Sequence, residues 1–188
     1  MNSEKVKAFI TLAGQRWAAA PRAGTEEERK LGAQLLLSEV LEYVIKGLGV
    51  TPVVNGMEIH QPDELHYKVT HTQHDIIEML DGLSDVAYTM YWNQLVFGLP
   101  LEEAFELVCD NNLTKFVKLN GAGWRVGELE RSLWHCKQDI VWPAEVAAVT
   151  VLKLGEEFFA VGKDARGKVR KPSSYVAVDL SGVGAAQL

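Results

Sequence analysis

Five acidic residues stand at helical spacing in two apolar stretches of the chain, and their type and spacing suit divalent-cation chemistry. Glu78, Asp81 and Asp85 lie three and then four residues apart, so in a helix they share one face. Glu39 and Glu42 lie one helical turn apart in an earlier apolar stretch. A carboxylate buried in an apolar helix must be paired or bind a metal ion. We therefore expect the two acid groups to face each other and hold Mg²⁺, with Mn²⁺ as a substitute.

Other roles for these acids are open at this point. Glu39 and Glu42 would be ordinary solvated residues if their side of the helix faced water. Redox iron is disfavoured, because di-iron bundles use a Glu-x-x-His motif and no histidine lies one turn from any of the five acids. Three histidines precede the later acid group at a spacing that suits neither helical nor strand ligation, so we expect them in a surface loop: His66, His71 and His74.

Two long helices must position the acids. Thr25 followed by Glu28 is a capping-box signature, and the apolar pattern after it continues to Gly47, a natural stop residue. The second helix is expected over residues 75–98, DIIEMLDGLSDVAYTMYWNQLVFG. Apolar residues surround most of its circumference, so we expect it to be buried on most sides.

The remaining elements are shorter. Residues 1–12 and 100–111 predict helices, the second with Pro100 in its first turn. Asn55-Gly56 predicts a type I′ turn between two short strands. Beyond residue 117 the pattern changes: residues 128–138 suggest a short helix, and residues 144–154 fit a helix or a strand equally. We expect a final hairpin that pairs 158–162 with 168–170.

Composition excludes several classes of function. The chain has 188 residues and a formal net charge of −6, which argues against non-specific nucleic-acid binding and against an anionic membrane surface, although a basic patch lies near the C-terminus. Cys109 and Cys136 form no zinc motif and are expected to be free thiols in a reducing compartment. We see no secretory signal and no apolar run of about 18 residues, so the expected location is the cytoplasm, or the host cytoplasm for a viral protein.

The order of three segments, SEVLEY, EMLDGLSDVAY and FGLPLEEAFELVCDNNLTK, resembles the all-α NTP pyrophosphohydrolases of the MazG-like group, which includes phosphoribosyl-ATP pyrophosphohydrolase. The pattern of that family is a Glu-x-x-Glu pair, an acid pair that ends in Asp, and a later helix that ends in Asn-x-x-Lys. The matching residues are Glu39, Glu42, Asp85, Asn112 and Lys115. The segment GKVRKPSSY, residues 167–175, is similar to the GK-x-x-KPPxY ending of many phage and bacterial members.

Two positions depart from the family pattern. Family members often have two adjacent glutamates where this chain has Ser38 and Glu39. The acid three residues before the final Asp is replaced by Gly82, and Asp81 is expected to take its place. These departures leave open the number of bound ions, and they motivate an alternative in which the protein is a non-catalytic helical oligomer that binds nucleotide. A purely structural bundle with its acids in salt bridges is a further alternative.

The resemblance implies an all-α core, a four-helix-bundle-type MazG-like fold completed by oligomerisation. Residues 1–117 would be the helical catalytic domain. Residues 118–188 would be a small mixed C-terminal extension with a β-hairpin and the GKVRKPSSY tail. The expected assembly is a homodimer or a homotetramer, with no nucleic-acid or membrane partner.

The implied reaction is hydrolysis of a nucleoside triphosphate between the α and β phosphates, which releases the monophosphate and pyrophosphate. Glu39, Glu42, Asp81 and Asp85 would be the catalytic and metal-binding residues, with Glu78 as an outer ligand or base. The nucleotide would be bound by Asn112, Lys115, Lys168, Lys171 and Tyr175. The viral MazZ type converts dGTP to dGMP, and we expect the same substrate here, with dUTP or dCTP as alternatives.

Overall fold

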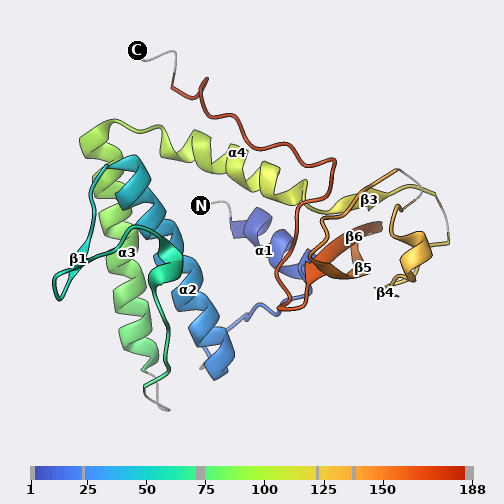
Figure 1. Cartoon of the computed structure of the whole chain (residues 1–188), viewed down its shortest axis with the longest axis horizontal. Helices are drawn as coiled ribbons and strands as arrows, with labels where there is room; N and C mark the ends of the chain where they lie inside the picture. Colours follow the sequence, from blue (N-terminus) through green and yellow to red (C-terminus); the bar gives the residue numbers. More distant parts are fainter. Residues whose placement is uncertain (1–2, 23, 71–74, 122, 137–138, 185–188) are drawn as a thin grey trace. The chain divides into compact units, whose positions relative to one another are not determined.

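The computed structural model describes residues 3–22, 24–70, 75–121, 123–136 and 139–184 (Figure 1). The chain divides into two compact units, one formed by Met1–Ala19 with Thr89–Leu188 and the other by Ala20–Tyr88. We call them the sheet unit and the helical unit and describe each by itself.

The helical unit begins with α2, Glu26–Glu42, which continues into a π-helical turn, Tyr43–Gly47. The predicted capping box is confirmed: Thr25 Oγ1 accepts the Glu28 N–H at 3.1 Å, and the Glu28 carboxylate accepts the Thr25 N–H at 2.7 Å. The predicted hairpin is also confirmed, with β1, Val53–Val54, paired to β2, Met57–Glu58. Asn55 and Gly56 have φ values of 51° and 79°, as a type I′ turn requires.

A 3₁₀ turn, Pro62–Glu64, and the first part of α3, Ile76–Phe97, complete the helical unit. The predicted helix over residues 75–98 is therefore confirmed to within one residue at each end. Of the three histidines expected in a surface loop, His66 is exposed, whereas His71 and His74 lie outside the described residues.

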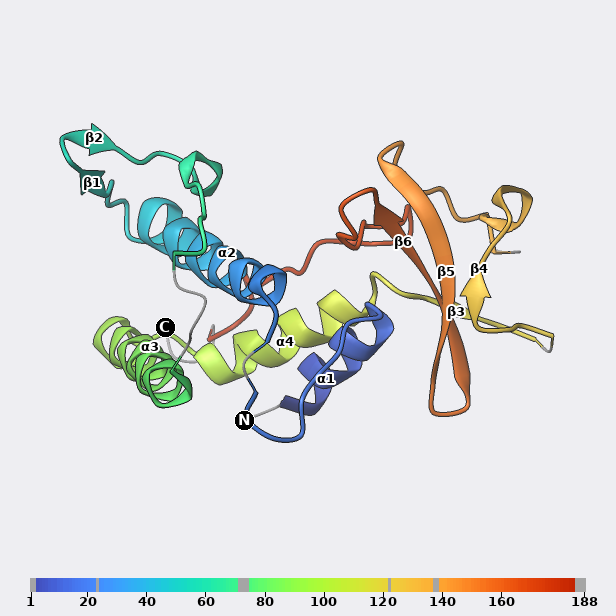
Figure 2. The same ribbon diagram turned by 90° about the horizontal axis from the view of Figure 1, so that it is seen from below.

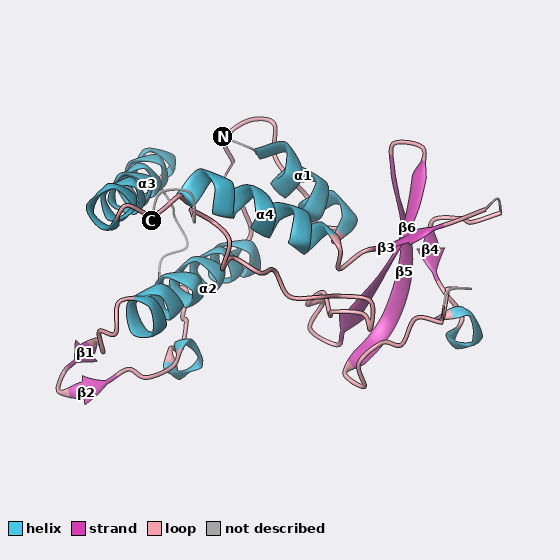
Figure 3. Cartoon of the chain, turned by 90° about the horizontal axis from the view of Figure 1, so that it is seen from above, coloured by secondary structure: helices cyan, strands magenta, loops and turns pink. Residues whose placement is uncertain are grey.

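The sheet unit contains the last part of α3, two complete helices and an antiparallel sheet (Figures 2 and 3). The complete helices are α1, Ser3–Leu12, and α4, Leu101–Leu113. The strand order is β3-β6-β5-β4, and the bounds are Val117–Leu119, Glu157–Asp164, Val146–Leu154 and Gly127–Glu128. A 3₁₀ turn, Arg131–Leu133, precedes the long strands.

Both faces of this sheet are covered by apolar side chains. Alternate residues of a strand point to opposite faces, and accordingly Ala160 of β6 belongs to one apolar cluster while Val161 belongs to the other. The first cluster contains Val149 and Val151 and is covered by the indoles of Trp124, Trp134 and Trp142. The second contains Leu12 of α1 and Phe116. The buried core of the sheet unit is therefore organised around β5 and β6.

The expectation of an all-α, four-helix-bundle core is wrong. The described residues form a mixed fold, with four α-helices and six strands in two sheets. The buried apolar residues lie mainly in and around the sheet, and neither α2 nor α3 has a buried residue. The physical reason is the sequence VAAVTVLKL, which forms β5 because its β-branched residues pack well on a pleated surface.

Two further details of the C-terminal half differ from expectation. The hairpin pairs β5 with β6, and the segment expected as its second strand contributes one isolated bridge, Lys163 to Val169. The short helix expected over residues 128–138 is only the 3₁₀ turn, with residues 137–138 outside the description. Within the described part of the chain, no helix has the length and apolarity needed to cross a membrane. The predicted boundary after residue 117 stays a prediction.

Candidate functional site

The five acids expected to bind metal all lie in the helical unit. Glu39 and Glu42 are on α2, and Glu78, Asp81 and Asp85 are on the first half of α3. All five side chains are exposed. Among the described residues, no group of three Asp, Glu, His or Cys side chains lies close enough together to hold an ion. A single chain therefore presents the acids without assembling them into a ligand set.

The acids stand among apolar side chains that this chain leaves uncovered. Leu35 of α2 is 57% exposed, and Leu80 and Leu83 of α3 are 63% and 60% exposed. The burial that we expected for α3 is thus not provided by its own chain. Exposed apolar residues at this density are typical of surfaces that contact another protein.

A second group of predicted residues gathers in the sheet unit, where the tail crosses the C-terminal end of α4. Lys115 Nζ donates to Asn112 Oδ1 at 2.6 Å. The Lys115 and Lys171 ammonium groups lie 6.0 Å and 4.6 Å from the centroid of the Tyr175 ring, within the range of cation–π attraction. Four of the five residues predicted to bind nucleotide therefore form one cluster, which we call the tail cluster: Asn112, Lys115, Lys171 and Tyr175.

Asn111 holds the tail cluster together, a role that the sequence did not indicate. Its Oδ1 accepts the Tyr175 hydroxyl at 2.6 Å, and its Nδ2 donates to the Val176 carbonyl at 2.6 Å. Asn112 matches the Asn-x-x-Lys pattern, whereas its neighbour Asn111 does not. The doubled asparagine was the available signal, but its partners are more than sixty residues away in the chain.

Lys168, the fifth predicted nucleotide-binding residue, is placed differently. Its backbone N–H donates to Asp164 Oδ1 at 2.9 Å in the turn after β6. Its side chain is exposed, and no described contact joins it to the tail cluster.

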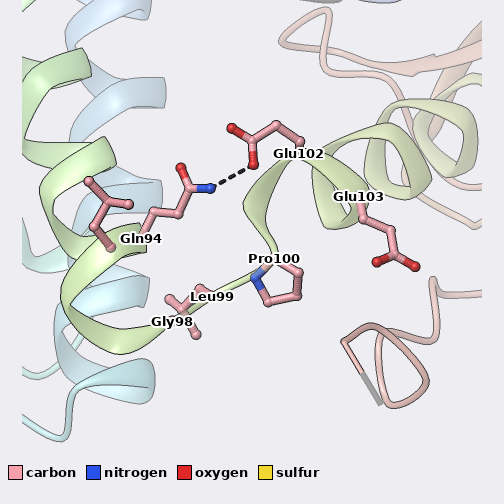
Figure 4. Close-up of a pocket in the computed structure, with 7 residues that line it drawn as sticks. Gln94, Gly98, Leu99, Pro100, Glu102 and Glu103 are labelled. Atoms are coloured by element: carbon pink, nitrogen blue, oxygen red, sulfur yellow. Dashed lines mark hydrogen bonds between the residues drawn. The ribbon is translucent and has the colours of Figure 1, made fainter. Parts of the chain in front are cut away.

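An open depression of about 400 Å³ lies where α3 meets α4 (Figure 4). Gln94 Nε2 donates to Glu102 Oε2 at 2.6 Å on one side of it, and Glu103 lies on the other side. None of the predicted site residues lines it; its lining residues are Gln94, Leu95, Gly98, Leu99, Pro100, Glu102 and Glu103.

The two thiols do not have the properties of catalytic nucleophiles. Burial raises the pKa of Cys136 to about 11 and also raises the pKa of Cys109. Both are free and buried. Because the thiolate is the nucleophilic form, these residues are structural parts of the core at neutral pH.

The charges of the two units differ. Residues 20–88 contain twelve acidic and five basic residues, whereas the rest of the chain contains thirteen acidic and fourteen basic residues. Carboxylates suit a hard cation and ammonium groups suit phosphates, so each group by itself suits a different class of ligand. Comparison with protein-family models, with curated proteins and with solved structures finds no match to this chain.

Proposed function

We propose that this protein is a Mg²⁺-dependent nucleoside triphosphate pyrophosphohydrolase that acts in the cytoplasm and prefers dGTP. The reaction forms a bond from water oxygen to phosphorus and breaks the α–β bridging bond, which gives dGMP and pyrophosphate. The observation that best supports it is the set of five exposed carboxylates on α2 and α3. Of these five carboxylates, only Glu42 has an ion-pair partner among the described residues, Lys46 at 3.1 Å. That pairing pattern argues against a purely structural role in salt bridges.

The donor types fit Mg²⁺, which prefers carboxylate oxygens and retains several waters. Glu39, Glu42, Asp81 and Asp85 would hold the ion, with Glu78 outside them, and Mn²⁺ would substitute. A bound ion would polarise the phosphoryl oxygens and lower the pKa of water. A carboxylate of this group that is not engaged by the ion would accept the proton of the attacking water.

The tail cluster would bind the substrate. Lys115 and Lys171 are ammonium donors for the triphosphate, and the Asn112 amide is a donor or acceptor for phosphate or sugar. The Tyr175 ring lies 6.0 Å from the Lys115 ammonium group and 4.6 Å from that of Lys171, so it helps to hold both beside the tail. Base selectivity towards dGTP follows only from the resemblance, with dUTP and dCTP as the alternatives.

The active form would be a homodimer or a homotetramer. The exposed apolar side chains of α2 and α3 need a cover, and a second copy would bury them together with the acids. Burial would raise the cost of an unpaired carboxylate and so favour ion binding. We therefore propose that assembly of the chains completes the ligand set that one chain leaves open.

A panel of NTPs and dNTPs, incubated with the pure protein and Mg²⁺, tests the proposal directly. We expect dGTP to be consumed fastest and to yield equal amounts of dGMP and pyrophosphate. Absence of pyrophosphate release from every nucleotide in the panel would contradict the proposal.

The site assignment is tested by Glu42→Gln and Asp85→Asn, which keep side-chain size and remove one charge. We expect turnover to fall by about 100-fold or more, because a lost ligand removes several kcal/mol of charge stabilisation. The elution volume on size exclusion should not change. Glu145→Gln removes an exposed carboxylate near β5 and is the matched control. Full activity in both site variants would overturn the assignment.

A non-catalytic nucleotide-binding oligomer is the second candidate, favoured by one observation. No three candidate ligands gather within the described part of one chain. Calorimetric titration with dGTP and Mg²⁺, followed by chromatography of the recovered nucleotide, separates the two candidates. Binding with intact dGTP recovered after a long incubation would favour this second function.

A further inference from the structure

Residues 163–171, KDARGKVRK, contain five cations and one carboxylate, although the whole chain is acidic. We call this segment the basic arm. It includes the last residues of β6 and the turn that follows, within the sheet unit. A charge density of this kind needs an explanation, because neighbouring like charges repel one another unless a partner compensates them.

The single carboxylate of the basic arm is used inside the arm. Asp164 is only 10% exposed, and its Oδ1 accepts the N–H groups of Arg166 and Lys168 at 2.9 Å each. Its Oδ2 accepts Arg170 Nε at 3.0 Å and Nη2 at 2.7 Å. Asp164 thus fixes the turn and neutralises Arg170. Its carboxylate does not form an ion pair with any other cation of the arm.

Three cations of the basic arm are exposed and have no acidic partner among the described residues, although one of them, Lys171, lies 4.6 Å from the Tyr175 ring centroid. The side chains of Arg166, Lys168 and Lys171 are exposed and make no ion pair with any described residue. Several other cations of the same unit are paired: Lys5 with Glu106 and Asp110, Lys118 with Glu157, and Lys153 with Glu156. Three cations without ion-pair partners, on a turn of fixed geometry, form a surface suited to a polyanion with regularly spaced charges.

We propose that the basic arm binds the phosphodiester backbone of nucleic acid without reading its sequence. Arginine and lysine side chains at a fixed spacing contact successive phosphates and release the counterions condensed on them. The hydrogen-bonded turn reduces the ordering cost of binding. An anionic membrane fits less well, because Val169 is half-buried and Pro172 is buried, so the arm has no large exposed apolar side chain to insert.

The proposal concerns a surface distinct from the carboxylates on α2 and α3, and it does not depend on the proposed hydrolysis. The arm shares Lys171 with the tail cluster, whereas Arg166 and Lys168 lie outside that cluster. The net charge of −6 that argued against nucleic-acid binding is an average over the chain, and the basic arm departs from it locally. Because the remainder of the protein repels phosphates, the contact is limited to about three phosphates and is strongest at low salt.

Fluorescence anisotropy with a labelled 20-base-pair DNA duplex and the full-length protein tests the proposal. Three contacted phosphates predict a slope of log affinity against log salt of about −2.7, so that affinity falls about 40-fold between 50 and 200 mM salt. The arm variant Arg166→Gln/Lys168→Gln/Lys171→Gln should lose at least about tenfold in affinity at 50 mM salt. The matched control, Arg16→Gln/Lys68→Gln/Arg125→Gln, removes the same charge from exposed positions outside the arm and should lose less than about twofold.

Several outcomes would overturn the proposal. Absence of duplex binding at 50 mM salt is one. An equal loss of affinity in the arm and control variants is another, because it would show that binding depends only on the net charge of the molecule. Displacement of the duplex by inorganic triphosphate at an equal phosphate concentration would assign the arm to a nucleotide. Arm-dependent binding to phosphatidylserine vesicles that is tighter than binding to DNA would assign it to membranes. Folding of the arm variant is checked by its circular dichroism spectrum and melting temperature. If the triple variant is unfolded, Arg166→Gln alone replaces it, and the slope of its log affinity against log salt should be weaker by about one.

Discussion

Gly162 of β6 lies directly against the indole ring of Trp142. A Cβ atom at position 162 would be 2.4 Å from Cε3 and 2.8 Å from Cζ3 of that ring. The ring cannot easily move, because Trp142 Nε1 donates to the Trp134 carbonyl at 2.8 Å. We expect Gly162→Ala to lower the free energy of unfolding by about 1–3 kcal/mol, measured by urea denaturation. Gly182→Ala, where a Cβ meets nothing within 4 Å, is the control, and equal stability of the two variants would contradict this packing.

Asp164 makes stability depend on pH. Burial opposes its ionisation, but the hydrogen bonds from Lys168 and Arg166 and the Arg170 guanidinium outweigh burial and hold the pKa of Asp164 below its usual range. A carboxyl whose pKa is lowered by folding stabilises the fold above its ordinary pKa of about 4 and loses that effect as pH falls through the lowered value. We therefore expect Asp164→Asn to lower the melting temperature at neutral pH and to approach wild type in acid. A difference in melting temperature that stays constant from pH 7 to pH 2 would contradict this linkage.

At the scale of elements, the C-terminal tail lies along α4 and approaches it closely at two places (Figure 1). Asn111 bonds both Tyr175 and Val176, and a Cβ at Gly184 would lie 3.0 Å from Pro100 Cγ. We expect Asn111→Ala to release the tail, because one side chain makes both hydrogen bonds at that end. Chymotryptic cleavage after Tyr175 should be faster in this variant, as followed by mass spectrometry.

The control for the tail is Asn93→Ala, because the Asn93 amide donates to the Thr89 carbonyl of its own helix. We expect its cleavage rate after Tyr175 to match wild type. Cleavage of Asn111→Ala at the wild-type rate would show that the tail is held mainly by other contacts. Release of the tail would also move Tyr175 away from Lys115, so it should weaken nucleotide binding if the proposed function is correct.

At the scale of the whole molecule, the exposed apolar surface of α2 and α3 predicts self-association. Light scattering after size exclusion should give at least twice the chain mass of 20.8 kDa. Leu83→Asp places a charge on α3, where a covering copy would have to desolvate it, and should lower the measured mass. Val176→Asp, at a tail residue that is 76% exposed, should leave the mass unchanged. A monomeric wild-type protein at tens of micromolar would contradict the prediction.

Local interactions explain which features could be predicted from the sequence. The capping box joins Thr25 to Glu28 and the hairpin turn uses Asn55 and Gly56, so each depends on neighbours within a few residues. The helical periodicity of residues 76–97 likewise lies within one segment. The amino-acid sequence alone therefore determined these elements and the helical position of all five acids.

Non-local contacts decided the rest. β5 is a strand because it pairs with β6 and its valines enter a core shared with β3. The hydrophobic periodicity of its sequence fits a helix and a strand equally, so it could not reveal those partners. The tail cluster depends on Asn111 and Tyr175, which are 64 residues apart. Whether the acids of α2 and α3 converge is likewise a question of how helices pack, since spacing along one helix places its acids on a face but does not determine what that face meets.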